Sequence, residues 1–280
     1  MEPLVEIKNL SIRFPEGNST FEAVKGISFS IGKGEIVGVV GESGSGKSMS
    51  ALALMGLLPK DAEIASGSLC FQGEDLVTMK PEKRRQLCGS KMAMVFQEPM
   101  TSLNPVLKIE RQVGESLRIH TKLGNAEIHE RVVQALSEVG LPDPEGLCGK
   151  YPHELSGGMR QRVMIAQAMI NSPSLLIADE PTTALDCVVQ AQILELLRNI
   201  HRTKGTSILF ISHDLKSVKS ISDRILVMYQ GRIVEELKKE ENFRYEHIYT
   251  ARLLESLPID HPSKRKTLVH NFEDAVLTAV

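Results

Sequence analysis

The segment Gly41–Ser48, with the sequence GESGSGKS, limits the fold more than any other part of the chain. It fits the phosphate-loop pattern of a glycine, four residues and then Gly-Lys-Ser, which requires a strand before it and a helix after it. Residues 35–40 before the loop read as a Val-rich strand, and residues 47–56 after it have a helical pattern. The sequence therefore predicts an α/β domain in which this loop receives phosphate groups.

The chemistry of the loop assigns roles to its side chains and its backbone. Glycines let the backbone wrap closely around phosphates, and the N–H groups at the helix start point towards negative charge. Lys47 is predicted to lie against the β- and γ-phosphates, and the Ser48 hydroxyl to bind Mg²⁺. The predicted nucleotide-binding residues are Gly41, Glu42, Ser43, Gly44, Ser45, Gly46, Lys47, Ser48 and Met49. The loop alone does not distinguish a kinase from a GTPase or a motor.

Further strand-like segments alternate with helical patterns along the chain. They are residues 24–31, 35–40, 91–96, 174–179, 206–212 and 223–229. This alternation predicts a largely parallel core sheet. We expect residues 1–235 to form one domain with a helical insertion at about 98–165. Residues 236–280 are expected to form a helical appendage with a short tail.

Two adjacent carboxylates, Asp179 and Glu180, end the most apolar of these strands. In open α/β folds the carboxyl end of such a strand faces the ligand. Asp179 suits the Mg²⁺ shell, and Glu180, one residue further, can accept a proton from an attacking water. Without the phosphate loop, a surface turn would explain the pair equally well. With the loop, a hydrolytic site is favoured.

Composition and charge exclude several classes of protein. The formal net charge of −2 supplies no basic field, so no nucleic-acid partner is expected. The four cysteines form no CxxC pair, and we interpret them as free thiols. The longest apolar run, residues 51–58, is too short for a membrane span, so any membrane association is expected to be peripheral.

The segment LSGGMRQR at residues 155–162 offers a second helix start suited to an anion. Ser156 stands at the N-cap, and Gly157 and Gly158 leave the first helical N–H groups uncovered. On physical grounds alone, an ordinary capped helix is the better interpretation. A chain with one phosphate loop, however, has little use for a second phosphate-directed helix end unless that end serves another molecule's nucleotide.

Taken in order, these motifs resemble those of ABC transporter ATPase subunits over roughly residues 4–235. The matching segments are the phosphate loop, Gln97 in VFQEP, LSGGMRQR, LLIADE at 175–180, ALD at 184–186 and His213 in ISHD. The resemblance implies a P-loop NTPase core of the ABC ATPase type, with an antiparallel β subdomain and an inserted helical subdomain. It also implies that two subunits pack head to tail, with each ATP between the phosphate loop of one and the LSGG segment of the other.

The resemblance gives roles to further residues. Ser156, Gly157 and Gly158, with Asp186, would act at the partner's ATP. Gln97 resembles the glutamine that reaches Mg²⁺ and the attacking water, and His213 resembles the histidine that holds the γ-phosphate. An aromatic residue before the loop usually stacks on adenine in this family, and Phe14 is our candidate, with Phe21 as the alternative.

Finer features resemble the ATPase subunits of the oligopeptide, dipeptide and nickel importer group. They include FQEPMTSLNP, GGMRQRVMIA, and DEPTTALD followed by VVQAQIL. The form GGMRQRVMIA is more similar to the first of the group's two ATPases, which implies a heterodimer with a second homologous subunit. Two membrane permeases and an extracellular solute-binding protein would complete the importer, with this chain at the cytoplasmic face of the membrane. Because no cysteine follows Cys187, no iron–sulfur cluster is expected.

A rival interpretation is a soluble ABC ATPase of DNA repair or translation. Repair members insert long coiled coils, but only 107 residues (49–155) separate Ser48 from Ser156. Translation factors of this type usually carry two cassettes, and this chain has one. An importer for peptides, nickel or a related small solute is therefore favoured.

Overall fold

A computed structural model describes residues 2–16, 19–97, 102–183 and 185–255 of the chain. Its centre is a six-stranded sheet of order β10-β9-β3-β8-β7-β6. The strands are β3 (Ile36–Val40), β6 (Met92–Val95), β7 (Leu175–Asp179), β8 (Ser207–Ser212), β9 (Arg224–Tyr229) and β10 (Arg232–Lys238). All neighbours are parallel except β10, which runs antiparallel to β9. The predicted parallel core sheet is confirmed.

A second, antiparallel sheet of order β2-β1-β4-β5 packs beside the first. Its strands are β1 (Val5–Glu16), β2 (Ser19–Ile31), β4 (Glu63–Phe71) and β5 (Glu74–Asp75). The predicted strand at 24–31 lies here, in β2, and not in the parallel sheet, because it returns antiparallel along β1. This sheet is the antiparallel subdomain that the family resemblance implied.

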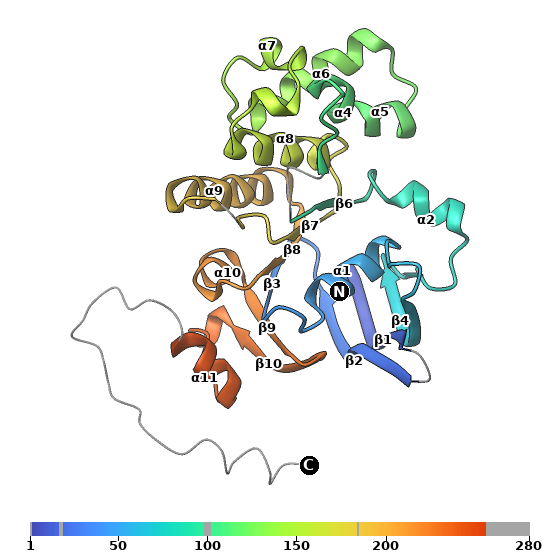
Figure 1. Cartoon of the computed structure of the whole chain (residues 1–280), viewed down its shortest axis with the longest axis vertical. Helices are drawn as coiled ribbons and strands as arrows, with labels where there is room; N and C mark the ends of the chain where they lie inside the picture. The colour runs from blue at the N-terminus through green and yellow to red at the C-terminus, as the bar shows by residue number, and fades with distance from the viewer. Residues whose placement is uncertain (1, 17–18, 98–101, 184, 256–280) are drawn as a thin grey trace, which may run out of the picture.

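Helix α1 (Lys47–Met55) lies between the two sheets, as Figure 1 shows. Its buried Ala51 and Leu54 belong to one apolar cluster with Ile7 and Phe71 of the antiparallel sheet and with Val39 of the central sheet. Helix α1 is therefore held from both sides, which fixes the position of the loop before it.

The other face of the central sheet is covered by helices. They are α8 (Gly157–Met169), α9 (Cys187–Lys204) and α10 (Leu215–Ile221), which share a second apolar cluster with that face. Above them in Figure 1 lies the helical subdomain. It contains α4 (Ile109–Val113), α5 (Glu115–His120), α6 (Asn125–Glu138), α7 (Pro144–Cys148) and the short helix η1 (Pro152–Glu154), while α2 (Pro81–Leu87) precedes β6.

The C-terminal part of the described chain consists of β10, the short helix η2 (Lys239–Glu241) and α11 (Ile248–Glu255). The domain boundary predicted at residue 235 falls inside β10, because the charged residues of this strand hide its pairing with β9. The tail predicted beyond α11 lies outside the described residues.

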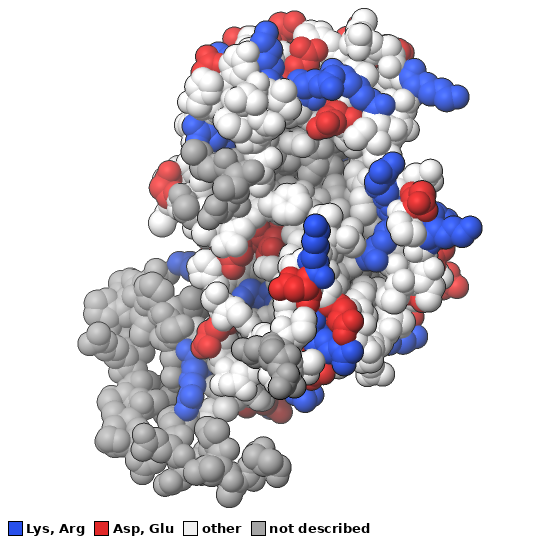
Figure 2. All heavy atoms as spheres, turned by 45° about the vertical axis from the view of Figure 1, so that its right-hand side comes forward, with Lys and Arg blue, Asp and Glu red and all other residues white. Residues whose placement is uncertain are grey.

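Two observations concern the surface of the molecule. Across the described ranges, none of the helices is both long and apolar enough to cross a membrane. On the face shown in Figure 2, Lys and Arg side chains are interspersed with Asp and Glu side chains, so neither sign of charge dominates that face.

Candidate functional site

The loop Gly41–Ser48 connects the end of β3 to the start of α1, and two of its glycines are required by close contacts. A Cβ atom at Gly41 would lie 2.1 Å from the carbonyl oxygen of Met228. Gly46 has a φ of +100°, and a Cβ there would lie 2.6 Å from the carbonyl oxygen of Ala23. Both positions therefore exclude any larger residue.

Lys47, the first residue of α1, is buried and folds back over the loop. Its Nζ donates hydrogen bonds to the carbonyl oxygens of Gly41 and Glu42, each at 2.8 Å. Burial lowers the pKa of this ammonium group, and the charges of Glu180 and Asp179 partly offset that effect. The two loop carbonyls thus hold the Lys47 ammonium group in the loop, where it can attract a phosphate group.

Ser48 and Asp179 meet where the loop and β7 come together. The Ser48 hydroxyl donates to Oδ1 of Asp179 at 3.0 Å. Burial raises the pKa of Asp179, and the hydrogen bond from Ser48 opposes this shift. A hydroxyl and a carboxylate oxygen in contact are hard oxygen donors of the kind that Mg²⁺ prefers, so these residues fit the predicted metal.

Glu180 is held in an unusual backbone conformation, with a φ of +50°. Its Oε2 accepts a hydrogen bond from Nδ1 of His213 and another from the Thr183 hydroxyl, both at 2.8 Å. The Glu180 side chain is 9% exposed, whereas that of His213 is 63% exposed. A strained backbone that carries a buried, doubly bonded carboxylate is typical of a catalytic position. Thr183 was not among the predicted residues, because a Thr in a turn has no distinguishing sequence signal.

These groups surround one cavity of about 420 Å³. The predicted residues that line it are Phe14, Ser43, Gly44, Gly46, Lys47, Ser48, Met49, Gln97, Glu180 and His213, together with the alternative Phe21. Phe14 and Phe21 are paired across β1 and β2, and Phe21 is 52% exposed. Gly41, Glu42 and Ser45 belong to the loop but are not among the residues that line this cavity, and Asp179 joins the site through its hydrogen bond with Ser48. The choice between the two aromatic residues for adenine stays a prediction.

The predicted partner-facing residues lie elsewhere. Ser156 caps α8 by accepting a hydrogen bond from the Met159 N–H at 3.3 Å, and Asp186 caps α9 through the N–H groups of Val188 and Val189. Ser156, Gly157, Asp186 and the adjoining Cys187 are exposed. Within the described chain, none of them lines the cavity around Lys47. Ala184 lies outside the described residues.

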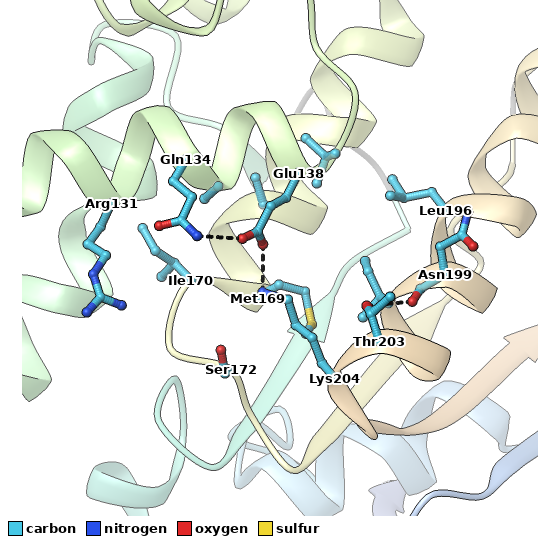
Figure 3. A pocket seen from close by; sticks show the side chains of 14 residues that line it. Arg131, Gln134, Glu138, Met169, Ile170, Ser172, Leu196, Asn199, Thr203 and Lys204 are labelled. Atoms are coloured by element: carbon cyan, nitrogen blue, oxygen red, sulfur yellow. Dashed lines mark hydrogen bonds and ion pairs between the residues drawn. The ribbon is translucent and has the colours of Figure 1, made fainter.

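A second cavity, of about 480 Å³, lies between α6, α8 and α9. Figure 3 shows Gln134 and Lys204 both turned to Glu138, and the Lys204–Glu138 ion pair of 2.6 Å links the helical subdomain to the core. No residue predicted for nucleotide binding or catalysis lines this cavity among the described residues. We therefore place the chemistry in the smaller cavity beside the loop.

Comparison with known proteins identifies the family of this chain. A sequence profile described as "ABC transporter" matches residues 24–183, more than half of the chain. The dipeptide transport ATP-binding protein DppD of Haemophilus influenzae is 48% identical over 91% of this chain and 78% of its own length. The oligopeptide transport ATP-binding protein OppD of Bacillus subtilis is 46% identical over 91% and 72%, respectively. The peptidoglycan transport ATP-binding protein YejF of Agrobacterium fabrum is 49% identical, and this chain spans 48% of its length.

Solved structures of similar fold point the same way. The dimeric post-hydrolysis structure of the ATP-binding cassette MJ0796, bound to ADP and Pi, has a TM-score of 0.76 and 26% identity, covering 86% of this chain and all of that one. CbiO1 from Clostridium perfringens, part of the ABC transporter complex CbiONQ, has a TM-score of 0.73 and 28% identity over 87% and 91%. The family suggested by the sequence motifs is confirmed: this chain belongs to the ABC transporter family, as an ATPase subunit.

Proposed function

We propose that this chain is the first of two ATPase subunits of a peptide importer and that it hydrolyses ATP at sites shared between subunits. The observation that supports this most strongly is the division of the motifs in space. Lys47, Ser48, Glu180 and His213 meet at one cavity, whereas Ser156 and Gly157 of the LSGG segment are exposed at the start of a different helix. A helix start that is open to solvent can serve a second molecule.

The proposed chemistry follows from the contacts at the cavity. Lys47 leaves the loop carbonyls to meet the β- and γ-phosphates, and the N–H groups at the start of α1 meet the remaining phosphate charge. Glu180 accepts a proton from the attacking water, with Thr183 and His213 fixing its carboxylate. Mg²⁺, held by Ser48, Asp179 and Gln97, supplies positive charge at the phosphates when it is bound.

A shared site requires the partner-facing groups to be free on this chain. Ser156, Gly157 and Asp186 are exposed, and Val188 beside them is 67% exposed. The MJ0796 cassette, similar in fold, is described as a dimer. These observations support a head-to-tail pair in which Ser156, Gly157 and Gly158 contact the ATP bound to the partner.

The proposed cargo and partners rest on the relatives. Those quoted above are named for transport of dipeptides, oligopeptides and peptidoglycan, which favours peptides over nickel as the substrate. We propose two permeases, a second homologous ATPase that makes a heterodimer, and an extracellular solute-binding protein. In this assembly the chain would lie peripherally on the cytoplasmic face of the membrane.

One experiment tests the base and the assembly together. The tagged full chain and its Glu180→Gln variant are purified from native membranes, and ATPase activity and co-purifying proteins are measured. Removal of the base should slow hydrolysis by roughly 100-fold or more while ATP binding persists. Mass spectrometry should recover a second ATPase and two permeases with both forms.

Glu195→Gln is the matched control, because Glu195 pairs only with Arg198 among its described ion pairs and lies on the exposed side of α9. It should hydrolyse ATP at the normal rate. Near-normal turnover in Glu180→Gln would remove Glu180 as the base, and recovery of the chain alone, soluble and active, would contradict the importer.

A further inference from the structure

The C-terminal helix α11 touches the phosphate loop directly. Tyr249, the second residue of this helix, accepts a hydrogen bond from the Glu42 N–H at 2.9 Å. Glu42 is the second residue of the loop, 207 positions earlier in the chain. Tyr249 is 7% exposed, so its hydroxyl reaches the loop from a buried position.

The position of Tyr249 is fixed by two independent contacts. Its ring packs on that of Tyr229 at the end of β9, with a centroid distance of 4.3 Å. The start of α11 is held by Glu235 of β10, whose Oε1 accepts hydrogen bonds from the N–H groups of Glu246 and His247 at 2.5 and 3.0 Å. The contacts of α11 with β9 and β10 thus fix the position of the Tyr249 hydroxyl beside the loop.

The hydrogen bonds of Glu42 give this contact a role in nucleotide binding. The Glu42 carbonyl accepts from Lys47, while the Glu42 N–H donates to Tyr249. When Lys47 turns to a phosphate, the Glu42 carbonyl loses one of its two donors and keeps the Ser45 N–H, at 3.2 Å, while the Glu42 N–H keeps its bond to Tyr249. The hydrogen bond that the Glu42 N–H donates to Tyr249 can therefore help to hold the loop in shape while Lys47 moves.

We infer that Tyr249 is a positioning residue for ATP, which keeps the loop in its binding conformation before the nucleotide arrives. A loop that is already ordered loses less conformational freedom on binding. Tyr249 lies outside residues 24–183, the part of the chain that the family profile matches. The inference rests on the proposed role of the loop at Gly41 in binding ATP.

The test is Tyr249→Phe, which removes the hydroxyl and retains the ring. The Kd for Mg-ATP is measured by calorimetry on the full chain, and KM and kcat on the assembly purified from membranes. We expect Kd and KM to rise about three- to tenfold, the size of one lost hydrogen bond. The kcat value should stay unchanged, because no contact of Glu180 is altered.

Tyr229→Phe is the matched control, since its hydroxyl accepts from Gln230 and not from the loop. It should leave Kd and KM unchanged. Unaltered Kd and KM in Tyr249→Phe would overturn the inference, as would a lowered melting temperature with normal KM, or an equal rise in KM in Tyr229→Phe. If the unmodified chain fails to bind ATP at all, the proposed function fails instead.

Discussion

Glu180 combines three features that the surrounding residues must maintain together. Its φ is positive, its carboxylate is nearly buried, and one oxygen accepts hydrogen bonds from two donors. His213 is largely exposed and is expected to turn to the γ-phosphate during turnover. Thr183 then becomes the donor that stays with the carboxylate.

Thr183→Val should therefore slow hydrolysis without weakening nucleotide binding. It removes one hydrogen bond to a charged group, worth roughly 1.5 kcal/mol or more, so we expect a loss in kcat of about tenfold. The measurements are kcat on the assembly and Kd for Mg-ATP on the full chain. Thr183→Ser keeps the donor and should retain most of the activity, and a fully active Val variant would show that His213 alone positions the base.

Some residues of the site could be predicted from the sequence, and others could not. Lys47, Ser48, Asp179 and Glu180 stand in fixed motifs, so their types and spacing point to phosphate chemistry. Thr183 and Tyr249 reach the site only because the chain folds. A threonine in a turn, or a tyrosine 207 residues from Glu42, belongs to no sequence motif that would point to this role.

Among the elements, strands with continuous apolar residues were predicted most accurately. β3, β7 and β8 are buried throughout, and each lies within one residue of its predicted bounds. β1 was missed because irregular pairing between residues 7 and 13 interrupts its alternation of apolar and polar residues. β10 was missed because it is an edge strand that exposes charged side chains.

In the helical subdomain, His129 of α6 links two other helices. Its Nδ1 and Nε2 lie 3.0 and 2.9 Å from carboxylate oxygens of Glu110 on α4 and Glu145 on α7. The hydrogen bonds to Glu110 and then to Glu145 raise the pKa of His129 above its ordinary value of 6.5. The charged imidazole thus favours the folded state.

This link predicts a pH dependence of stability. Because the folded pKa is raised, the stabilisation is fully present below pH 6.5 and is lost as the pH rises through the folded pKa. The melting temperature of the unmodified chain should therefore exceed that of His129→Gln at pH 6, with the gap closing at higher pH. A gap that is constant between pH 6 and pH 9 would contradict the prediction. The control is His153→Gln, because the ring of His153 stacks on Tyr151 and contacts no carboxylate among the ion pairs of the described residues.

At the scale of the whole molecule, Gly157 can distinguish a requirement of the single chain from a requirement of the two-subunit assembly. Apart from its chain neighbours and its own helix backbone, no described atom lies within 4 Å of a Cβ placed at Gly157, so packing within the described chain does not require a glycine there. In a shared site, a methyl group would cover the N–H groups that face the partner's phosphate.

Gly157→Ala should leave Mg-ATP binding to the purified full chain unchanged. ATPase activity of the assembly should fall on the order of tenfold to 100-fold, as when one backbone donor to a reacting group is lost. Gly149→Ala is the control, because among the described residues a Cβ there would contact the Gly146 carbonyl oxygen alone, at an ordinary distance of 3.9 Å. Equal activities of the two variants would argue against an LSGG segment that serves the partner.

Cys187, at the start of α9, offers a way to observe this assembly. It is the exposed cysteine of the four, while burial raises the pKa of the Cys148 thiol to about 11 and also raises the pKa values of the Cys70 and Cys88 thiols. A thiol-reactive fluorophore should therefore attach selectively at Cys187. Because Cys187 adjoins Asp186 at the proposed subunit boundary, the label would report each closing and opening of the dimer as a change in its emission, with no substitution in the chain.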